Sequence, residues 1–332
     1  MSDMYRTALA IAALAAAGLS APASAQEKSI SIGLPGIPPV FVTTQAYVAE
    51  QQGFFKKHGL KVSLRPFDSG AAAARAVQSG QIELSMSPSP LIATMISNNP
   101  DVDLALIYGY PRPTWKLGSL DGSITKCEDV KGKAVGVDSL GGARSIALNQ
   151  MLRSCKLSAS DTNQVALSAN VGAAMVAGQI PLGVLHVDEL PAVEREAKKK
   201  VGIVVDINQT QPVNHYLALV AKKKSIAEDR DTLVKVIAAF IEAERFLRDP
   251  KNVDAAAKAA APTGRSIDDA KAAIPDYVKI GFWPQDNPGL AKENLDAIIG
   301  AQQRAGNIKG TPTTVERLAD TSLYEAALKL AK

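Results

Sequence analysis

The sequence predicts an α/β protein of two lobes with like architecture, each built on a mostly parallel sheet with helices on both faces. Three observations predict this. Strand and helix patterns alternate over the first two thirds of the chain, which is typical of parallel sheets covered by helices. One helix-and-strand signature occurs twice, around Gly80 and again around Gly178. The length of 332 residues suits about two domains.

The elements of the first part follow from their periodicity. Residues 29–34 alternate as a half-buried strand does, and residues 42–58 carry an apolar helical stripe that ends at Gly59. Strand and helix patterns then alternate up to residue 108. We expect strands at 29–34, 60–67, 82–86 and 102–108, and helices at 42–58, 71–79 and 90–97.

The alternation restarts further along and then gives way to helices. We expect strands at 134–138, 164–167, 182–187 and 201–207, with helices at 143–153, 172–177 and 190–200 between them. From Asp231 onward the pattern is helical, and it predicts helices at 232–247, 253–260, 267–278, 290–305 and 314–328.

The repeated signature predicts that the two lobes are built alike. In residues 69–87 and 170–187, an Ala-rich helix is followed by Gly-Gln-Ile and an apolar strand. A small-residue helix can pack close to a sheet, and the Gly ends it in the left-handed region. Two such lobes imply a cleft between them, and α/β proteins bind ligands in such clefts, at the carboxyl ends of parallel strands.

Residues 1–25 have the pattern of a cleaved secretory signal peptide. Arg6 precedes an apolar run over residues 8–19, and Ala23-Ser24-Ala25 is a small-x-small cleavage site. The run is shorter than the roughly 20 apolar residues that a membrane-spanning helix needs, and charges interrupt every later apolar stretch. We therefore expect an exported, periplasmic mature protein without a membrane anchor.

Composition and cysteine use exclude several classes of function. With 37 basic and 33 acidic residues and 5% aromatics, the chain lacks the features of a nucleic-acid-binding protein. In an oxidising compartment, Cys127 and Cys155 are expected to form a disulfide. Two cysteines and three scattered histidines offer no metal-ligand cluster. No motif for nucleophilic catalysis or phosphate binding is present, so we expect no enzyme and no cofactor.

Two segments carry a family resemblance. GFFKKHGLKVSLRPFDSGAAAARAVQSGQIEL, residues 53–84, resembles the first-lobe signature of substrate-binding proteins that feed ABC importers. The branch handles sulfonates, taurine, nitrate and the pyrimidine precursor of thiamine. DVKGKAVGVDSLGGARSIALNQMLRSCKLSASD, residues 129–161, resembles the start of the second lobe in the same proteins.

The resemblance implies a type II periplasmic binding protein fold, in which two Rossmann-like lobes joined by two crossover segments close around a small molecule. On this chain, lobe one would comprise residues 27–110 plus 217–332, and lobe two residues 111–216.

We expect the ligand where strands run into Gly, Ser or Pro turns that open helices. Helix N-termini expose unpaired N–H groups, so several converging termini attract an anion, although ordinary capping also explains any single turn. The turn residues are Pro35, Gly36, Ser69, Gly70, Ser87, Ser89, Ser139, Gly141 and Gly142.

Side chains near these turns complete the expected site. Arg144 opens the helix after Gly141-Gly142 and could clamp a carboxylate or sulfonate with two hydrogen bonds. The alternative for each candidate is a structural role as a solvated helix residue, a surface linker, a helix cap or a hinge contact. The other candidates, at the crossovers and at the cleft mouth, are Arg112, Trp115, His186, Asp188, Asn214 and His215.

Two hypotheses follow. The favoured one is a monomeric, non-catalytic protein that captures a small organic anion, such as a sulfonate, a taurine-like compound or a carboxylate. It would deliver this ligand to an ABC permease driven by an ATPase partner. The alternative is a binding protein for the thiamine-pyrimidine precursor or the related pyrimidine synthase, an enzyme whose Cys-rich motif is absent from this sequence.

Overall fold

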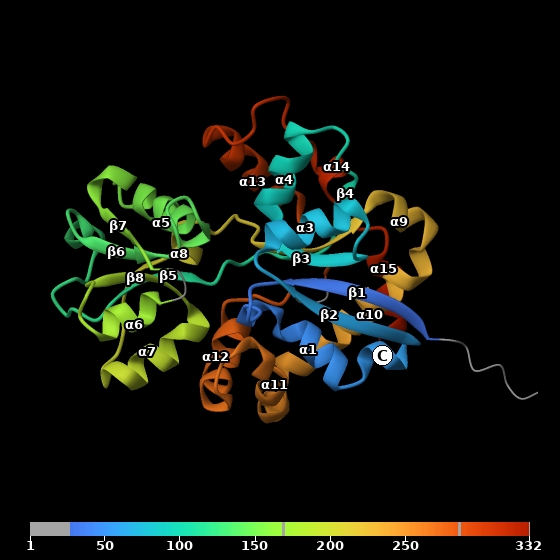
Figure 1. The fold of residues 1–332 in the computed structure, drawn as a ribbon, viewed down its shortest axis with the longest axis horizontal. Coiled ribbons are helices and arrows are strands. Elements are labelled where there is room, and N and C mark those ends of the chain that lie inside the picture. The colour runs from blue at the N-terminus through green and yellow to red at the C-terminus, as the bar shows by residue number, and fades with distance from the viewer. Residues whose placement is uncertain (1–26, 168–169, 285–286, 332) are drawn as a thin grey trace, which may run out of the picture.

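The computed structural model describes residues 27–167, 170–284 and 287–331. These residues form two lobes that lie side by side, and the chain crosses between them twice (Figure 1). The expected signal peptide, residues 1–25, lies outside the described residues. Within the described part of the chain, no helix is both long enough and apolar enough to cross a membrane.

Lobe one is built on a five-stranded sheet in the order β2-β1-β3-β10-β4. β1 is parallel to β2 and β3, whereas β10 is antiparallel to both of its neighbours. The last strand therefore returns to the sheet from a distant part of the chain. The bounds are β1 Lys28–Pro35, β2 Leu60–Phe67, β3 Leu84–Pro88, β4 Leu104–Tyr110 and β10 Leu217–Lys222.

Lobe two repeats this plan in a second sheet, ordered β7-β6-β8-β5-β9. β6 is parallel to β7 and β8, and β5 is antiparallel to β8 and β9. In both sheets, the antiparallel strand is the one that begins directly after a crossover. The bounds are β5 Trp115–Ser119, β6 Ala134–Val137, β7 Asn163–Ala166, β8 Leu182–His186 and β9 Gly202–Asp206.

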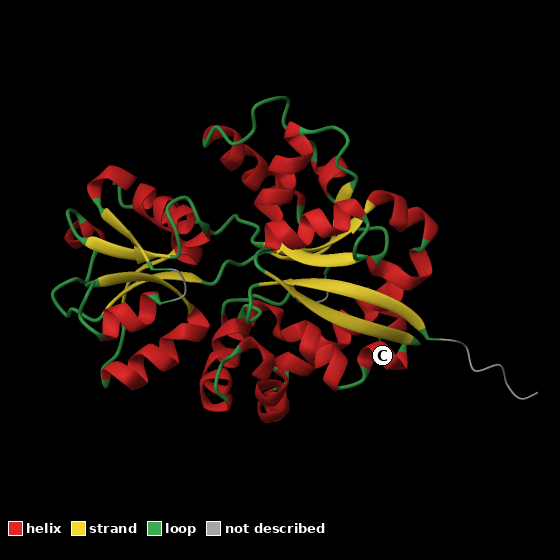
Figure 2. Cartoon of the chain, viewed as in Figure 1, coloured by secondary structure: helices red, strands yellow, loops and turns green. Residues whose placement is uncertain are grey.

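Helices cover both faces of each sheet (Figure 2). In lobe one they are η1 Phe41–Thr43, α1 Thr44–Gln51, α2 Phe54–Lys57, α3 Gly70–Ser79, α4 Ser89–Asn98, α9 Lys223–Glu228, α10 Arg230–Arg248, η5 Pro250–Asn252, α11 Val253–Ala259, η6 Ala261–Thr263, α12 Ile267–Lys279, α13 Lys292–Arg304, α14 Val315–Leu318 and α15 Tyr324–Leu330. In lobe two they are η2 Cys127–Val130, α5 Ala143–Ser154, η3 Ala159–Asp161, α6 Val171–Val176, η4 Val187–Glu189, α7 Leu190–Ala197 and α8 Ile207–Thr210.

The repeated signature is present in both lobes as expected. α3 ends at Gly80 and α6 is followed by Gly178, and both glycines have a positive φ, 80° and 71° respectively. A side chain at such a φ is strained, so glycine suits both positions. Ile82 and Ile180 then lie in the core clusters of their own lobes.

Two expected helices are divided in the structure. Gly53, with φ 75°, separates α1 from α2 within residues 42–58. Residues 314–328 form α14 and α15 instead of one helix, because the chain between them pairs with β4: Asp320 N donates to the carbonyl of Leu106 at 2.9 Å. Backbone pairing with a sheet edge here replaces a turn of helix.

Candidate ligand site between the lobes

A buried carboxylate joins the lobes directly. Asp188, in η4 of lobe two, is only 1% exposed. It accepts hydrogen bonds from two lobe-one groups, Arg265 Nε at 2.8 Å and the hydroxyl of Tyr277 in α12 at 2.7 Å. At the rim of the same interface, Arg195 of α7 pairs with Asp269 of α12. In Figure 1, α7 and α12 accordingly lie next to each other.

A groove with a volume of about 720 Å³ opens beside this contact, between α7 and α12. The run Lys198–Lys200 lines it together with Glu194 and Asp276. Lys200 bonds Glu194 at 2.5 Å, and Lys199 donates to the carbonyl of Leu120. These lysines therefore belong to a rim of mixed charge.

Aromatic rings connect the core of lobe one to the core of lobe two, because Tyr216 packs against both. We name the set of six the interlobe aromatic cluster. Adjacent rings in it have centroids 5.0 to 6.4 Å apart, which is the range of favourable aromatic contact. Both tryptophans of the chain are members. The cluster consists of Tyr110, Trp115, Tyr216, Tyr277, Phe282 and Trp283.

The turn after β6 does not present a free helix N-terminus. The carboxylate of Asp138 accepts from the backbone N–H of Ala143 at 3.0 Å and from that of Arg144 at 3.1 Å. Ser139 and Gly141 are exposed, and Gly142 is the N-terminal cap residue of α5. The place where the sequence analysis expects an anionic ligand is therefore occupied by a carboxylate of the chain itself.

Arg144 also differs from its expected role. Its guanidinium is buried and forms two hydrogen bonds with the carboxylate of Glu189, at 2.8 and 2.9 Å, and a third with the carbonyl of Val184. Burial alone would raise the pKa of Glu189, but the Arg144 charge outweighs it and lowers that pKa to about 2. Arg144 also lies over the Trp115 ring, 5.5 Å from its centroid. The described structure thus shows a structural ion pair.

Most polar groups at the lobe-one turns also have hydrogen-bond partners within the chain. Ser69, at the start of α3, accepts from the N–H of Ala72 at 3.2 Å. Ser87 donates to the carbonyl of Gly70 at 2.9 Å. Pro35 ends β1, and the N–H of the next residue, Gly36, donates to the carbonyl of Phe67, the last residue of β2. Ser89 is different and is described below.

One candidate, Arg112, ties the crossovers together, and a second, Asn214, bonds its own neighbour. Arg112 donates through Nη1 to the carbonyl of Pro212 at 2.6 Å, which links the first crossover to the second. Asn214 accepts from the N–H of His215 at 2.7 Å. Asn208 donates to the carbonyl of Pro113. These bonds fix the path of the chain between the lobes.

The two candidate histidines are buried and neutral. Burial lowers the pKa of His186 and of His215 to about 4. His186 Nδ1 bonds Thr114 Oγ1 at 2.5 Å, and its ring lies against Trp115 with centroids 3.5 Å apart. His215 Nε2 donates to the carbonyl of Gly289 at 2.8 Å.

Buried polar atoms near the interface without a hydrogen-bond partner among the described residues include Ser89 Oγ, Tyr110 Oη, His215 Nδ1, Asn208 Oδ1 and Trp283 Nε1. The backbones of Ser89, Tyr110 and His215 are close to one another, because Ser89 N donates to the carbonyl of Tyr216, the residue after His215, and Tyr216 N donates to the carbonyl of Tyr110. Buried polar groups are nearly always paired, so unpaired ones mark positions where a ligand or water completes the bonding.

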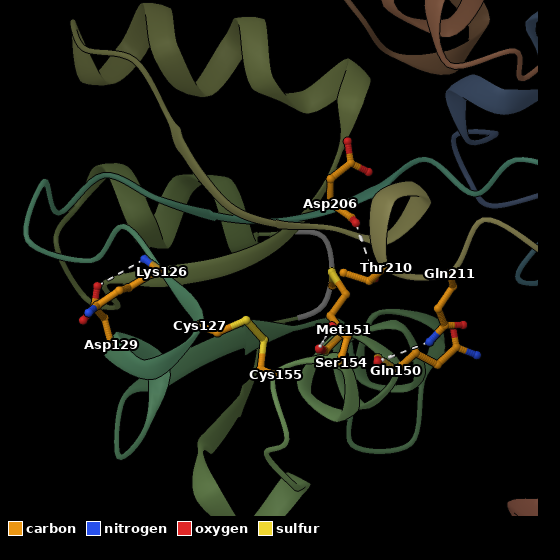
Figure 3. Close-up of a disulfide and its surroundings, with 10 residues drawn as sticks. All are labelled: Lys126, Cys127, Asp129, Gln150, Met151, Ser154, Cys155, Asp206, Thr210 and Gln211. Carbon is orange, nitrogen blue, oxygen red and sulfur yellow. Dashed lines mark hydrogen bonds between the residues drawn. A yellow bond between two sulfur atoms is a disulfide. The ribbon is translucent and has the colours of Figure 1, made fainter.

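The expected disulfide is confirmed. Cys127, at the start of η2, and Cys155, which follows α5, are joined with their Cα atoms 5.4 Å apart (Figure 3). The bond ties two segments of lobe two that are separated by 28 positions in the sequence. Among the described residues, no group of three or more His, Cys, Asp or Glu side chains is arranged to hold a metal ion.

The strand-end turns are recognisable in the sequence, whereas the groups that the C-terminal part of lobe one contributes to the interface are not. Arg265, Tyr277, Phe282 and Trp283 come from the C-terminal region, where the pattern indicates only helices. One available signal was the tryptophan in Phe282-Trp283, since the chain has only two.

Comparison with known proteins agrees with this architecture. No functionally curated protein matches the sequence. The structure is similar to the periplasmic aliphatic sulphonate binding protein of Escherichia coli, with a TM-score of 0.70 at 17% identity over 90% of this chain and 99% of that chain. It is also similar to the periplasmic nitrate-binding protein of Synechocystis PCC 6803, with a TM-score of 0.71 at 11% identity over 92% and 89%.

A third similar structure is the alkanesulfonate-binding protein of Xanthomonas axonopodis pv. citri bound to MOPS, with a TM-score of 0.68 at 15% identity over 89% of this chain and 99% of that chain. Identities this low show a shared fold, which is the two-lobed periplasmic binding protein fold. Residues 41–252, more than half of the chain, match the family described as NMT1/THI5 like. The chain belongs to the NMT1/THI5-like family.

Proposed function

We propose that the chain is the periplasmic substrate-binding component of an ABC importer, and that it is a monomer without catalytic activity. Lobe one would comprise residues 27–110 plus 217–332 and lobe two residues 111–216, and these lobes would close on a small molecule between them. The closed form would then deliver the ligand to a permease that an ATPase partner drives. Residues 1–25 would direct export and be removed.

One observation carries this proposal. The interface between the lobes is lined by buried aromatic rings and holds polar atoms without partners, Ser89 Oγ and Trp283 Nε1 among them. Small-molecule sites usually combine apolar side chains with a few polar groups, and both kinds of side chain occur at this interface. The similar solved structures, named for sulfonate and nitrate binding, support the same use of the fold.

Ligand screening of the mature protein tests the proposal. A ligand at a hundred times its dissociation constant stabilises the folded state by about 2.7 kcal/mol, which raises the melting temperature measurably. The same ligand should reduce the radius of gyration in small-angle scattering if it draws the lobes together. A ligand panel that leaves both quantities unchanged contradicts a cleft-closing binding protein.

Export is tested separately by mass spectrometry. The protein from the periplasmic fraction should begin at Gln26, and a protein that still contains residues 1–25 contradicts the signal-peptide assignment.

The ligand class has two candidates. The sequence favours a small organic anion, and the alternative is the thiamine-pyrimidine precursor, an aromatic compound. A pyrimidine synthase on this fold would be an enzyme, and turnover of such a precursor by the purified protein would identify it.

A further inference from the structure

We propose that the groove between α7 and α12 is a docking site for a partner protein, and that it takes an acidic, extended segment of that partner. The groove lies at the rim of the interlobe contact, and the proposed function assigns no role to it. No interlobe ligand is needed to test the docking site, so its failure would leave the proposed function as it stands.

Both lobes form the groove. Its volume of about 720 Å³ is in the range of sites that enclose a ligand of many atoms, and it exceeds what a single ion needs. Leu190 and Pro191 of lobe two and Ala272 of lobe one supply apolar surface, and the other lining residues are charged. Because α7 belongs to lobe two and α12 to lobe one, a segment bound here would contact both lobes at once.

The lining side chains carry an excess of positive charge, since four are basic and two are acidic. Two of the cations have carboxylate partners. Arg195 pairs with Asp269, and Lys200 bonds Glu194 at 2.5 Å. The two lysines that remain form no ion pair with any described residue, so their charge is available to carboxylates from outside the chain.

Lys198 is the more informative of these two lysines. It follows α7 with φ 54° and ψ 29°, a left-handed conformation that glycine adopts without strain and other residues adopt rarely. The helix dipole favours a cation at this end of α7, but Arg195 in the last turn already supplies one. Within the described part of the chain, the Lys198 ammonium has no hydrogen bond, whereas Lys199 donates to a neutral group, the carbonyl of Leu120, at 3.1 Å.

Asp276 of α12 sets the orientation of the bound segment. It is exposed, lines the groove from lobe one, and has no side-chain partner among the described residues. A carboxylate placed beside Asp276 would be repelled. The acidic residues of the segment must therefore lie on the lysine side, and its apolar residue against Leu190 and Ala272.

Matched peptides test the charge preference. The probes are Glu-Glu-Leu-Glu-Glu, Gln-Gln-Leu-Gln-Gln and Lys-Lys-Leu-Lys-Lys, each labelled with an uncharged fluorophore. Fluorescence anisotropy with the mature protein at low ionic strength, where screening is weak, measures their binding. We expect the acidic peptide to bind at least about fivefold more tightly than the other two, because two exposed lysines attract it. An acidic peptide that binds no more tightly than the glutamine peptide overturns the proposal.

Variants with opposite expected effects locate the bound peptide. Lys198→Gln removes an attractive charge and should weaken the acidic peptide about threefold to fivefold, the effect of one exposed ion pair. Asp276→Asn removes a repulsive charge from the lobe-one wall and should strengthen the same peptide by a similar factor. Lys198→Gly removes the same attractive charge and also relieves the left-handed backbone, so this folded variant should show the same weakening.

The matched control is Lys224→Gln, in the second run of three lysines, Lys222–Lys224. Lys224 has a side chain that is 70% exposed, and it lies in α9, far from α7 in Figure 1. Equal weakening in Lys224→Gln and Lys198→Gln would show a general attraction to a basic protein and would overturn the docking site.

Two other results would also overturn the proposal. An acidic-peptide affinity that Asp276→Asn leaves unchanged would show that lobe one does not line the bound segment. Co-sedimentation with phosphatidylglycerol vesicles that Lys198→Gln abolishes, in the absence of peptide binding, would assign these lysines to a membrane surface instead of a partner protein.

Discussion

Replacing Asp188 by Asn tests whether one carboxylate holds the lobes together. Asp188 is 1% exposed and lies between two donors from the other lobe, Arg265 Nε at 2.8 Å and the Tyr277 hydroxyl at 2.7 Å. Asparagine has nearly the same size and keeps an acceptor for Tyr277. The variant therefore removes the charge that pairs with Arg265 while changing the packing little.

The expected magnitude follows from the burial of the pair. Removing one partner of a buried ion pair costs about 3–5 kcal/mol when the remaining charge stays buried. Here the lobes can separate and return Arg265 to water, so this figure is an upper bound on the shift from the closed to the open arrangement. A shift of about 2 kcal/mol would change the ratio of closed to open molecules roughly 30-fold.

Small-angle scattering and ligand titration measure this shift. We expect Asp188→Asn to increase the radius of gyration without ligand. Its apparent affinity should fall as the closed fraction falls, because the closed arrangement holds the ligand. The matched control is Arg195→Gln, which removes the rim pair with Asp269. The Arg195 side chain is 54% exposed, and exposed pairs contribute little, so this variant should keep the wild-type radius.

A folded Asp188→Asn protein with the wild-type radius and the wild-type affinity would refute this reasoning. In that case, the contact between η4 and α12 would be a consequence of closure and would not stabilise it.

Three further perturbations have definite expected results. Thiol labelling of the mature protein without reductant should modify neither Cys127 nor Cys155, and labelling of both contradicts the disulfide. Reduction should lower the melting temperature, because the loss of loop-closure entropy stabilises the folded state by about 3.5 kcal/mol for this span. Arg144→Ala should lower the free energy of unfolding by about 3–5 kcal/mol, measured with denaturant, because Glu189 is left buried and unpaired. A folded variant of unchanged stability that loses ligand affinity would instead restore Arg144 as a ligand contact. The free energy of unfolding should fall as the pH drops from about 6.5 to 4. The two buried histidines of the interface have a pKa of about 4 when folded and the ordinary 6.5 when unfolded, so the unfolded chain binds more protons in that window. Each histidine contributes up to about 3 kcal/mol to this fall in the free energy of unfolding. A free energy of unfolding that stays constant between pH 7 and 4 would contradict the burial of these histidines as neutral groups.

The sequence predicted the parallel part of both sheets and missed one strand in each. Trp115–Ser119 is short and contains Lys116 and Gly118, so it shows little alternation. Leu217–Lys222 is a continuous apolar run, which periodicity alone does not assign. Both strands follow a crossover and run antiparallel to their neighbours. Their direction is set by where the chain re-enters a lobe, which local sequence does not encode.

For the candidate site, the sequence indicated the turns but not their partners. Arg144 and Glu189 are 45 positions apart, and Asp188 and Arg265 are 77 positions apart. A short pattern such as Gly141-Gly142 before an Arg predicts a helix start and a cation near it. It does not show that a carboxylate from the distant helix η4 already neutralises that cation.

The segment from His186 to Glu189 joins the folding of lobe two to the contact with lobe one. Glu189 accepts the N–H of His186 at 2.8 Å and binds Arg144, so both ends of the segment are fixed within lobe two. Asp188, between them, points to Arg265 and Tyr277 in the other lobe. Separation of the lobes would break the Asp188 contacts and leave the Arg144 pair in place. Because Arg265 is 28% exposed whereas the side chains of Arg144 and Glu189 are about 10% exposed, solvent and salt reach the interlobe pair first. Rising salt should therefore open the lobes before it destabilises lobe two.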